Sequence, residues 1–570
     1  MASPSSICAN CTPGHDGCKE IGRFSCKNCR LVNYCGRECQ KAHWAIHKID
    51  CRSPLGKDGW QPAWVHERRQ PSFVVSDNEP QFFGMNKYLW GNVPALDVLK
   101  LDANEGVNYN RDLSLLFAAS GDIRNVAKTI AELPESYKRS VHVVINDREF
   151  DVVARNIIIL LIALVVEDPN EAAECIIHVW YSALLRESDM AILRHRIRPL
   201  IVDLCNKSIK KPSNALLGKT WTFGKHSLRV VLRKVAWNRL VCYLDPVLGL
   251  TVERAHKVRT GVTMSEHRKD RLERGIFASK PFYRVALVKF REDGLLLPFG
   301  APRSEFTVPN PTFFQNNGYW PMLDASDPLS GWPINDMMNT PYGPANADIY
   351  GKLYCLLRST LKAFIARLSA SKITLEHLHV DAMELPRYIH NRAPFSRIDV
   401  SNIADRGYVG LRYTLGAMLP LLQDNHVNPH ATLIALFINA VGETENRQDV
   451  AREYTAATRV VKRLMPHFPA HIRLSHTTFA YDAKLMVLEN THSQFMFHDQ
   501  VFDRYLSSND ADNLAILFRA AIKQVHTIVQ TWPFTVTTTP VTPEAQEVFD
   551  RMLGSNHTGK ERYVEWQRRP

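Results

Sequence analysis

Hydrophobic and polar positions follow two rhythms along the chain. Residues 113–119 form a short apolar run typical of a buried strand, and residues 141–145 form a second run that ends near Asp147. Helical periodicity follows each run, over residues 123–133 and over the long apolar stretch 149–166. This alternation of strands and helices predicts the opening of a doubly wound α/β fold.

A long insertion is expected to interrupt this α/β domain. Between residues 168 and 370 the pattern predicts mostly helices, at 170–185, 189–204 and 228–240. The stretch 282–314 reads instead as strands interrupted by prolines. We therefore expect the α/β domain to be built from two separate pieces of the sequence.

The α/β rhythm resumes after the insertion. Residues 375–380 and 396–400 predict strands, the first of which ends at Asp381. Residues 410–422 predict a helix and residues 431–440 a further strand. Because two strands rarely make a stable sheet, we expect both pieces to share one parallel sheet that is covered on both faces.

Length, charge and hydropathy exclude several classes of protein. A chain of 570 residues is too long for one core. Its net charge of +12 is a mild bias without a run of five or six basic residues, so we expect no nucleic-acid partner. The longest apolar run, residues 157–166, is too short to cross a bilayer, which takes about 20 residues. The N-terminus has no signal-peptide pattern. We expect no membrane partner and an intracellular location, in the cytoplasm and/or the nucleus.

Cysteines are concentrated at the start of the chain. Of 12 cysteines, eight lie in the first 51 residues, and the other four are scattered through apolar surroundings. Clustered cysteines without a secretory signal indicate metal binding rather than disulfides. The clustered residues are Cys8, Cys11, Cys18, Cys26, Cys29, Cys35, Cys39 and Cys51.

The spacing of these residues is that of zinc ligands. Two sulfurs two residues apart on a tight turn point at one centre, and an x3 spacing in a helix places two ligands on one face. Eight ligands make two tetrahedral zinc sites, and they come in the pairs Cys8-x2-Cys11, Cys26-x2-Cys29, Cys35-x3-Cys39 and His47-x3-Cys51. The long stretch between Cys11 and Cys26 also holds His15 and Cys18; we interpret Cys18 as a loop thiol, and His43 could compete with His47.

The second half of this segment resembles a MYND finger. The matching pattern is Tyr34-Cys35-x3-Cys39-Gln40-x2-His43-Trp44-x2-His47-x3-Cys51. In that family the ligand pairs interleave, and the family pattern favours His47 over His43. The resemblance implies one zinc on Cys8, Cys11, Cys35 and Cys39, and a second on Cys26, Cys29, His47 and Cys51.

The same resemblance implies a docking role. MYND fingers generally bind short, often proline-containing peptides, so we expect a protein partner. The charge of residues 1–52 falls from +4 to about +1 once seven thiolates and two zinc ions are counted, which makes a poor phosphate clamp. Metal binding must supply the folding energy of so small a segment. We expect it to fold apart from the body, as separate domains do.

Residues 381–386 form an Asp-Ala-x-x-Leu-Pro strand end, and with the sequence at 398–402 they make the body resemble class I methyltransferases. The stretches 90–97, 121–124, 152–156 and 179–185 carry a closer likeness, which covers roughly residues 80–500. They resemble the dynein axonemal assembly factor 3 family and fungal proteins that join a related domain to a MYND finger. These likenesses imply a Rossmann-like, methyltransferase-like fold.

A methyl donor would need a glycine-rich first loop, where small residues let the ligand approach the backbone. When the family's acid-x-Gly-x-Gly-x-Gly pattern is superposed, Gly121 alone matches, and Leu115, Phe117 and Ala119 stand at the other positions. This favours a non-catalytic domain.

Two carboxylates complete the candidate cofactor site. The resemblance places Asp147 at the ribose-binding position and Asp381 near the adenine of S-adenosylmethionine, although each also suits a helix N-cap. The leading hypothesis is a zinc-binding interaction or regulatory protein. The alternative is an S-adenosylmethionine-dependent protein methyltransferase that the finger recruits to its substrate.

The predicted organisation follows from these patterns. It comprises a finger at 1–52, a linker at 53–80, the two parts of the methyltransferase-like domain at 81–167 and 371–535, the insertion at 168–370 and a C-terminal helix and tail at 536–570.

Overall fold

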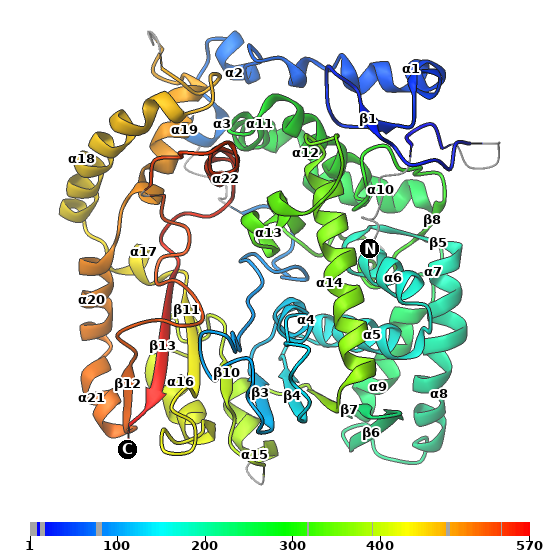
Figure 1. The fold of residues 1–570 in the computed structure, drawn as a ribbon, viewed down its shortest axis with the longest axis vertical. Coiled ribbons are helices and arrows are strands. Elements are labelled where there is room, and N and C mark those ends of the chain that lie inside the picture. Colours follow the sequence, from blue (N-terminus) through cyan, green and yellow to red (C-terminus); the bar gives the residue numbers. More distant parts are fainter. Residues whose placement is uncertain are drawn as a thin grey trace.

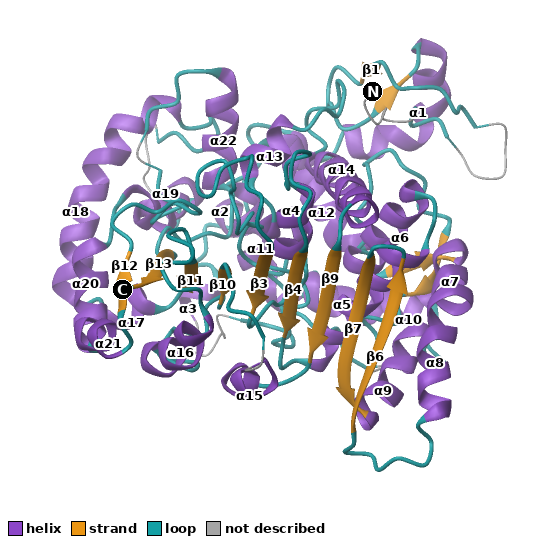
Figure 2. Ribbon diagram, turned by 60° about the horizontal axis from the view of Figure 1, so that its bottom comes forward, coloured by secondary structure: helices purple, strands orange, loops and turns teal. Residues whose placement is uncertain are grey.

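The structure, a computed structural model, describes residues 8–11, 17–75, 82–315, 318–389, 392–474, 479–536 and 538–569. Within them, nine strands form one large sheet with helices on both faces (Figures 1 and 2). These strands are β3 (Leu113–Phe117), β4 (Val141–Asn146), β6 (Leu216–Phe223), β7 (His226–Arg233), β9 (Ile373–Leu378), β10 (Arg397–Asp399), β11 (Thr432–Phe437), β12 (Ala520–Ile522) and β13 (Arg562–Arg568).

The strand order in the sheet is β12-β13-β11-β10-β3-β4-β9-β7-β6. The strands from β11 to β7 in this order run parallel, whereas β13 and β6 are antiparallel to their neighbours. Phe117 of β3 pairs with Asp399 on one side and with Ile145 on the other. The prediction that both α/β pieces share one sheet is therefore confirmed.

Helices cover this sheet and form the rest of the molecule. The longer ones are α1 (Arg37–Cys51), α5 (Phe150–Val165), α6 (Pro169–Tyr181), α8 (Arg198–Lys207), α10 (Val252–Thr263), α12 (Pro281–Asp293), α14 (Ile349–Ala370), α18 (Arg447–Leu464), α20 (Asp499–Ser508) and α22 (Pro543–Leu553). The shorter ones are α2 (Ala63–His66), α3 (Ser72–Val75), α4 (Arg124–Ala131), α7 (Glu187–Ile192), α9 (Lys234–Val241), α11 (Lys269–Phe277), α13 (Ile334–Asn339), α15 (Leu385–Ile389), α16 (Leu411–Met418), α17 (Ala440–Thr444), α19 (Ala483–Thr491) and α21 (Ala511–Leu517).

Helix α5 is the apolar helix of the core. It is buried from Phe150 to Ala163, and it packs against α6, α14 and the strands β7 and β9. A helix that is apolar nearly all round needs cover on more than one side, and the parallel sheet together with the insertion supplies it.

The insertion differs from its predicted form in two places. Residues 228–240 are not one helix: β7 pairs with β9, and its buried Leu228, Val230 and Leu232 follow the period of two that defines a strand. Residues 282–314 are not mainly strand. Their first part lies in α12, which begins at Pro281, ends at Asp293 and is followed by Gly294 in the left-handed conformation. The strand that remains is β8 (Phe306–Pro309), which pairs with β5 (Leu184–Arg186).

The N-terminal segment packs onto the body rather than standing apart (Figure 1). Its Leu31 and Val32 are buried in the same hydrophobic cluster as the body's own core residues. Ala9 lies so close to Gly300 that a side chain at 300 would collide with it, and the Ala347 amide donates to the Arg30 carbonyl at 3.0 Å. The expectation of a separate finger core is wrong, because so small a segment shares its apolar contacts with the body.

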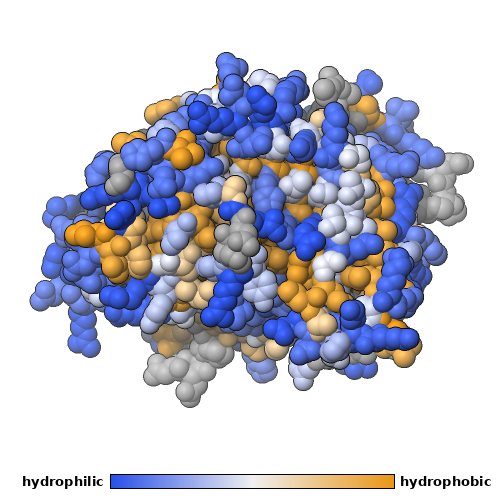
Figure 3. Space-filling model, turned by 90° about the horizontal axis from the view of Figure 1, so that it is seen from below, coloured by the Kyte–Doolittle hydropathy of each residue, from blue (hydrophilic) through white to orange (hydrophobic). Residues whose placement is uncertain are grey.

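The surface shows no dominant apolar band from below, where hydrophobic side chains appear in patches between hydrophilic ones (Figure 3). None of the helices in the described residues is long and apolar enough to span a bilayer.

Candidate metal centre and docking groove

Two local structures bring the metal ligands together. A short hairpin, made of the two-residue strands β1 (Phe24–Ser25) and β2 (Asn33–Tyr34), holds the turn that carries Cys26 and Cys29. Helix α1 presents His47 and Cys51 one turn apart on its buried side. The ring of His47 directs Nε2 at the Cys29 sulfur, 3.4 Å away.

The group Cys26, Cys29, His47 and Cys51 fits a zinc ion. Their ligand atoms all lie within 4.8 Å of one another, and the Cys26 and Cys51 sulfurs are 3.7 Å apart. Zinc–sulfur bonds of about 2.3 Å in a tetrahedron place two sulfurs about 3.8 Å apart. The neighbouring thiol of Cys29 lowers the pKa of Cys26 to about 3, and the Asn28 amide donates to the Cys51 sulfur at 3.3 Å.

The other group contains Cys18 in place of the predicted Cys11. Cys8, Cys18, Cys35 and Cys39 have sulfurs within 4.8 Å of one another, and Cys35 lies 3.5 Å from Cys18 and 3.4 Å from Cys39. Cys11 lies outside this group.

Backbone pairing explains this exchange. The Cys18 amide donates to the Asn10 carbonyl at 3.0 Å and the Cys8 amide to the Glu20 carbonyl at 3.0 Å, so the chain turns back and sets Cys18 beside Cys8. The unusual length between Cys11 and Cys26 was the sequence signal for this turn. His43 belongs to neither group, and its Nδ1 lies 3.0 Å from the Tyr34 hydroxyl.

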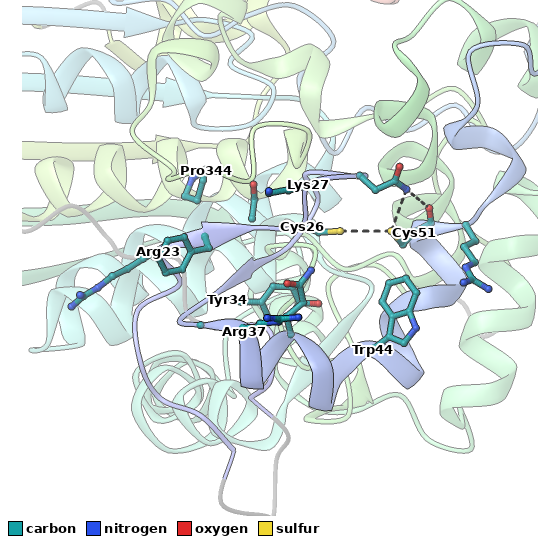
Figure 4. A pocket seen from close by; sticks show the side chains of 14 residues that line it. Arg23, Cys26, Lys27, Tyr34, Arg37, Trp44, Cys51 and Pro344 are labelled. Carbon is teal, nitrogen blue, oxygen red and sulfur yellow. Dashed lines mark hydrogen bonds between the residues drawn. The ribbon is translucent and has the colours of Figure 1, made fainter.

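A groove of about 820 Å³ runs beside the metal group that contains Cys26 and Cys51 (Figure 4). Trp44 and Arg37 come to it from α1, and Pro344 reaches it from a loop of the body. Sequence reasoning missed Pro344, since no local pattern brings residue 344 to the finger. The groove is lined by Arg23, Phe24, Ser25, Cys26, Lys27, Asn28, Tyr34, Gly36, Arg37, Gln40, Trp44, Cys51, Arg52 and Pro344.

Two of the predicted cofactor residues, Gly121 and Asp147, bind each other. Gly121 has a φ of +55°, and its amide donates to the Asp147 carboxylate at 2.9 Å. The same carboxylate accepts from the Glu149 amide at 2.8 Å, and burial raises the pKa of Asp147. The ribose-binding position is thus engaged within the chain.

The loop after β3 is covered by the segment that precedes the sheet. The Gly91 amide donates to Asp122 at 2.8 Å, and Arg124 donates to the Val93 carbonyl at 2.9 Å. Phe117 is itself buried in the core. A methyl donor at this loop would have to displace the chain's own residues.

Asp381 follows β9, the strand that pairs with β4, and β4 leads to Asp147. Asp381 caps a short helix through the Met383 amide at 2.9 Å and lines a cavity of about 180 Å³ with His379, Arg148 and Arg233. Gly121 and Asp147 do not line this cavity, but Arg148, the residue after Asp147, does.

Comparison with known proteins found family models that match two stretches of the chain. Residues 8–51 match the family model of the MYND finger, and residues 89–185 match a model described as "Domain of unknown function (DUF4470)". The N-terminal segment is therefore a MYND zinc finger, and a DUF4470 match follows it in the body.

Two relatives match over short stretches. "Dynein axonemal assembly factor 3" of Danio rerio is 35% identical over 79 residues, which is 14% of this chain and 16% of that protein. "SET domain and MYND-type zinc finger protein 6" of Schizosaccharomyces pombe is 31% identical over 52 residues, 9% of this chain and 10% of that protein. No solved structure matches the chain.

Proposed function

We propose that this protein is an adaptor whose zinc-loaded finger docks a short, proline-containing peptide of a partner protein. The observation that carries this proposal is the groove, because Gln40 and Trp44 of the MYND pattern both line it and Trp44 is 36% exposed. Proline-rich segments bind grooves lined by aromatic rings, and Phe24 and Tyr34 line this one as well.

The proposal includes two zinc ions. One is held by Cys26, Cys29, His47 and Cys51, and the other by Cys8, Cys18, Cys35 and Cys39, the two groups that the ligand distances support. Clustered metal-binding cysteines suit a reducing compartment, so the proposal places the protein in the cytoplasm or the nucleus.

The body is proposed to be a methyltransferase-like scaffold without catalytic activity. Numbered along the chain without the β6–β7 hairpin, its strands give the doubly wound order 3-2-1-4-5-6, with the antiparallel β13 inserted between the last two. The loop after β3 is covered by residues of the chain itself, which argues against a bound methyl donor. The alternative, a methyltransferase that the finger recruits to its substrate, keeps some support from the relative whose name joins a SET domain to a MYND finger.

Trp44→Ala tests the docking role. Peptides would first be selected from a random library on the full-length, zinc-loaded chain. Truncating a central aromatic anchor typically costs at least about 2 kcal/mol, so we expect affinity to fall about 30-fold with the zinc content unchanged.

Ile46→Ala is the matched control, because Ile46 is exposed on the same helix but does not line the groove. Equal affinity in the wild type and Trp44→Ala would contradict the proposal. Calorimetry with S-adenosylmethionine tests the alternative, and saturable binding would favour an enzyme.

A further inference from the structure

The groove beside the finger is lined by cations without a matching acid. Four basic side chains, those of Arg23, Lys27, Arg37 and Arg52, border it and are exposed. Its lining contains no carboxylate, and in the described part of the chain none of the four forms an ion pair. Most exposed charges on a folded surface are mixed in sign, so this local excess sets the groove apart.

The bound metal does not cancel this charge. The nearby site has three thiolates and one imidazole, which leave one negative charge after a zinc ion is counted. Four cations therefore outweigh it. The N-terminus of α1 also faces the groove at Gly36, and the one carboxylate of its first turn, Glu38, lies outside the lining and pairs with Lys41 at 3.2 Å.

Arg37 is placed against its own local preference. It begins α1, where the helix dipole disfavours a cation. Arg52 lies at the other end of the same helix, with its guanidinium carbon 5.5 Å from the centre of the Trp44 ring. A peptide that packs on Trp44 would thus meet a cation at each end of α1.

The body also contributes a residue, Pro344, to the lining of the groove. Pro344 is carried by a loop that is anchored at Asp348, which accepts from the Phe299 amide at 2.7 Å and from the Gly351 amide at 2.8 Å. Figure 4 shows Pro344 on the side of Arg23 and Lys27, with Trp44 away from it. The finger and the body together therefore define the length of the site.

We propose that the occupant of this groove is an acidic peptide, with an apolar or proline core on Trp44 and aspartate or glutamate on both flanks. This rests on the proposed docking function and adds the charge of the partner. Charge complementarity across such an interface raises the association rate and selects partners more than it adds affinity.

Selection from a random peptide library on the full-length, zinc-loaded protein tests the proposal. We expect the enriched peptides to carry acidic residues on both sides of the apolar core, and we expect their affinity to fall as salt rises. The double reversal Arg23→Glu/Arg37→Glu should weaken binding about tenfold, since two exposed ion pairs are lost and two repulsions are added.

Lys41→Glu/Lys48→Glu is the matched control, because both lysines are exposed on α1 outside the groove. It should change affinity less than twofold. Peptides that depend on Trp44 but have neutral or basic flanks would overturn this inference and leave docking intact. Failure to select any peptide would overturn both.

Discussion

The finger and the sheet domain, which is the part of the body built on the nine-stranded sheet, are each stabilised by different physical means. The finger leaves large apolar side chains in water, such as Phe24 at 62% and Ile46 at 62% exposed, and its order comes from two clusters of ligands. The sheet domain buries α5 almost completely and pairs its strands into one layer. Loss of metal should therefore damage the first region directly, and loss of buried contacts should damage the second.

The two regions nevertheless share a boundary. Leu31 and Val32 of the finger are buried against the body, and the Arg30 carbonyl accepts from Ala347. Such a contact couples the two stabilities, because whatever unfolds the finger also exposes the apolar surface beneath it.

Zinc removal should have the largest effect. Structural zinc in small fingers contributes apparent free energies of about 10–16 kcal/mol, so a chelator should unfold the finger entirely. The body should stay folded with a lowered Tm, because it loses the cover of Leu31 and Val32. Circular dichroism melts with and without chelator, alongside zinc analysis, would measure this; an unchanged Tm of the body would show that the boundary carries no energy.

Cys18→Ser and Cys11→Ser form the next pair. The structure groups Cys18 with Cys8, Cys35 and Cys39 and leaves Cys11 outside this group. Cys18→Ser should therefore lower the zinc content from two ions towards one, and Cys11→Ser should keep both. Native mass spectrometry gives the count for each variant. The reverse outcome would restore the ligand set that the family pattern implies.

A buried ion pair in the body allows the body to be destabilised while the zinc sites of the finger stay intact. Arg397 binds both oxygens of Glu105 at 2.8 and 2.7 Å, and both side chains are buried. Arg397→Met leaves a buried carboxylate unpaired, which should cost about 3–5 kcal/mol in urea unfolding while two zinc ions stay bound. The double variant Arg397→Met/Glu105→Leu should recover part of that loss. A single variant as stable as the wild type would contradict the importance of this pair.

Two glycine substitutions give the smallest effects, of opposite sign. Gly121→Ala forces a side chain into the left-handed region and should destabilise the body by about 1 kcal/mol. Gly261→Ala, inside α10 with open space around it, should stabilise by about 0.5–1 kcal/mol. Urea unfolding measures both, and equal signs would show that the φ at Gly121 is not strained for alanine.

The sequence predicted what depends on local pattern. The strands β3, β4, β9 and β11 were readable because short apolar runs define them, and seven of the eight residues in the two metal groups were readable from ligand spacing. Cys18 was missed because its place depends on pairing between residues 8–10 and 18–20.

Other features depend on distant contacts. Val230 and its neighbours read as a helix because the strand β9 that pairs with β7 lies far away in the sequence. Pro344 was invisible as part of the groove for the same reason. The contact of the loop after β3 with residues 91–93 is also a tertiary contact that no local pattern predicts.

The central claim is that the zinc-ordered finger, seated on the body, forms the docking groove. Fluorescence anisotropy of one selected peptide, titrated with the zinc-loaded, the chelator-stripped and the zinc-restored full-length chain, tests it most directly. The account predicts that binding is lost on stripping and returns when zinc is restored. Equal binding by the stripped chain would contradict it.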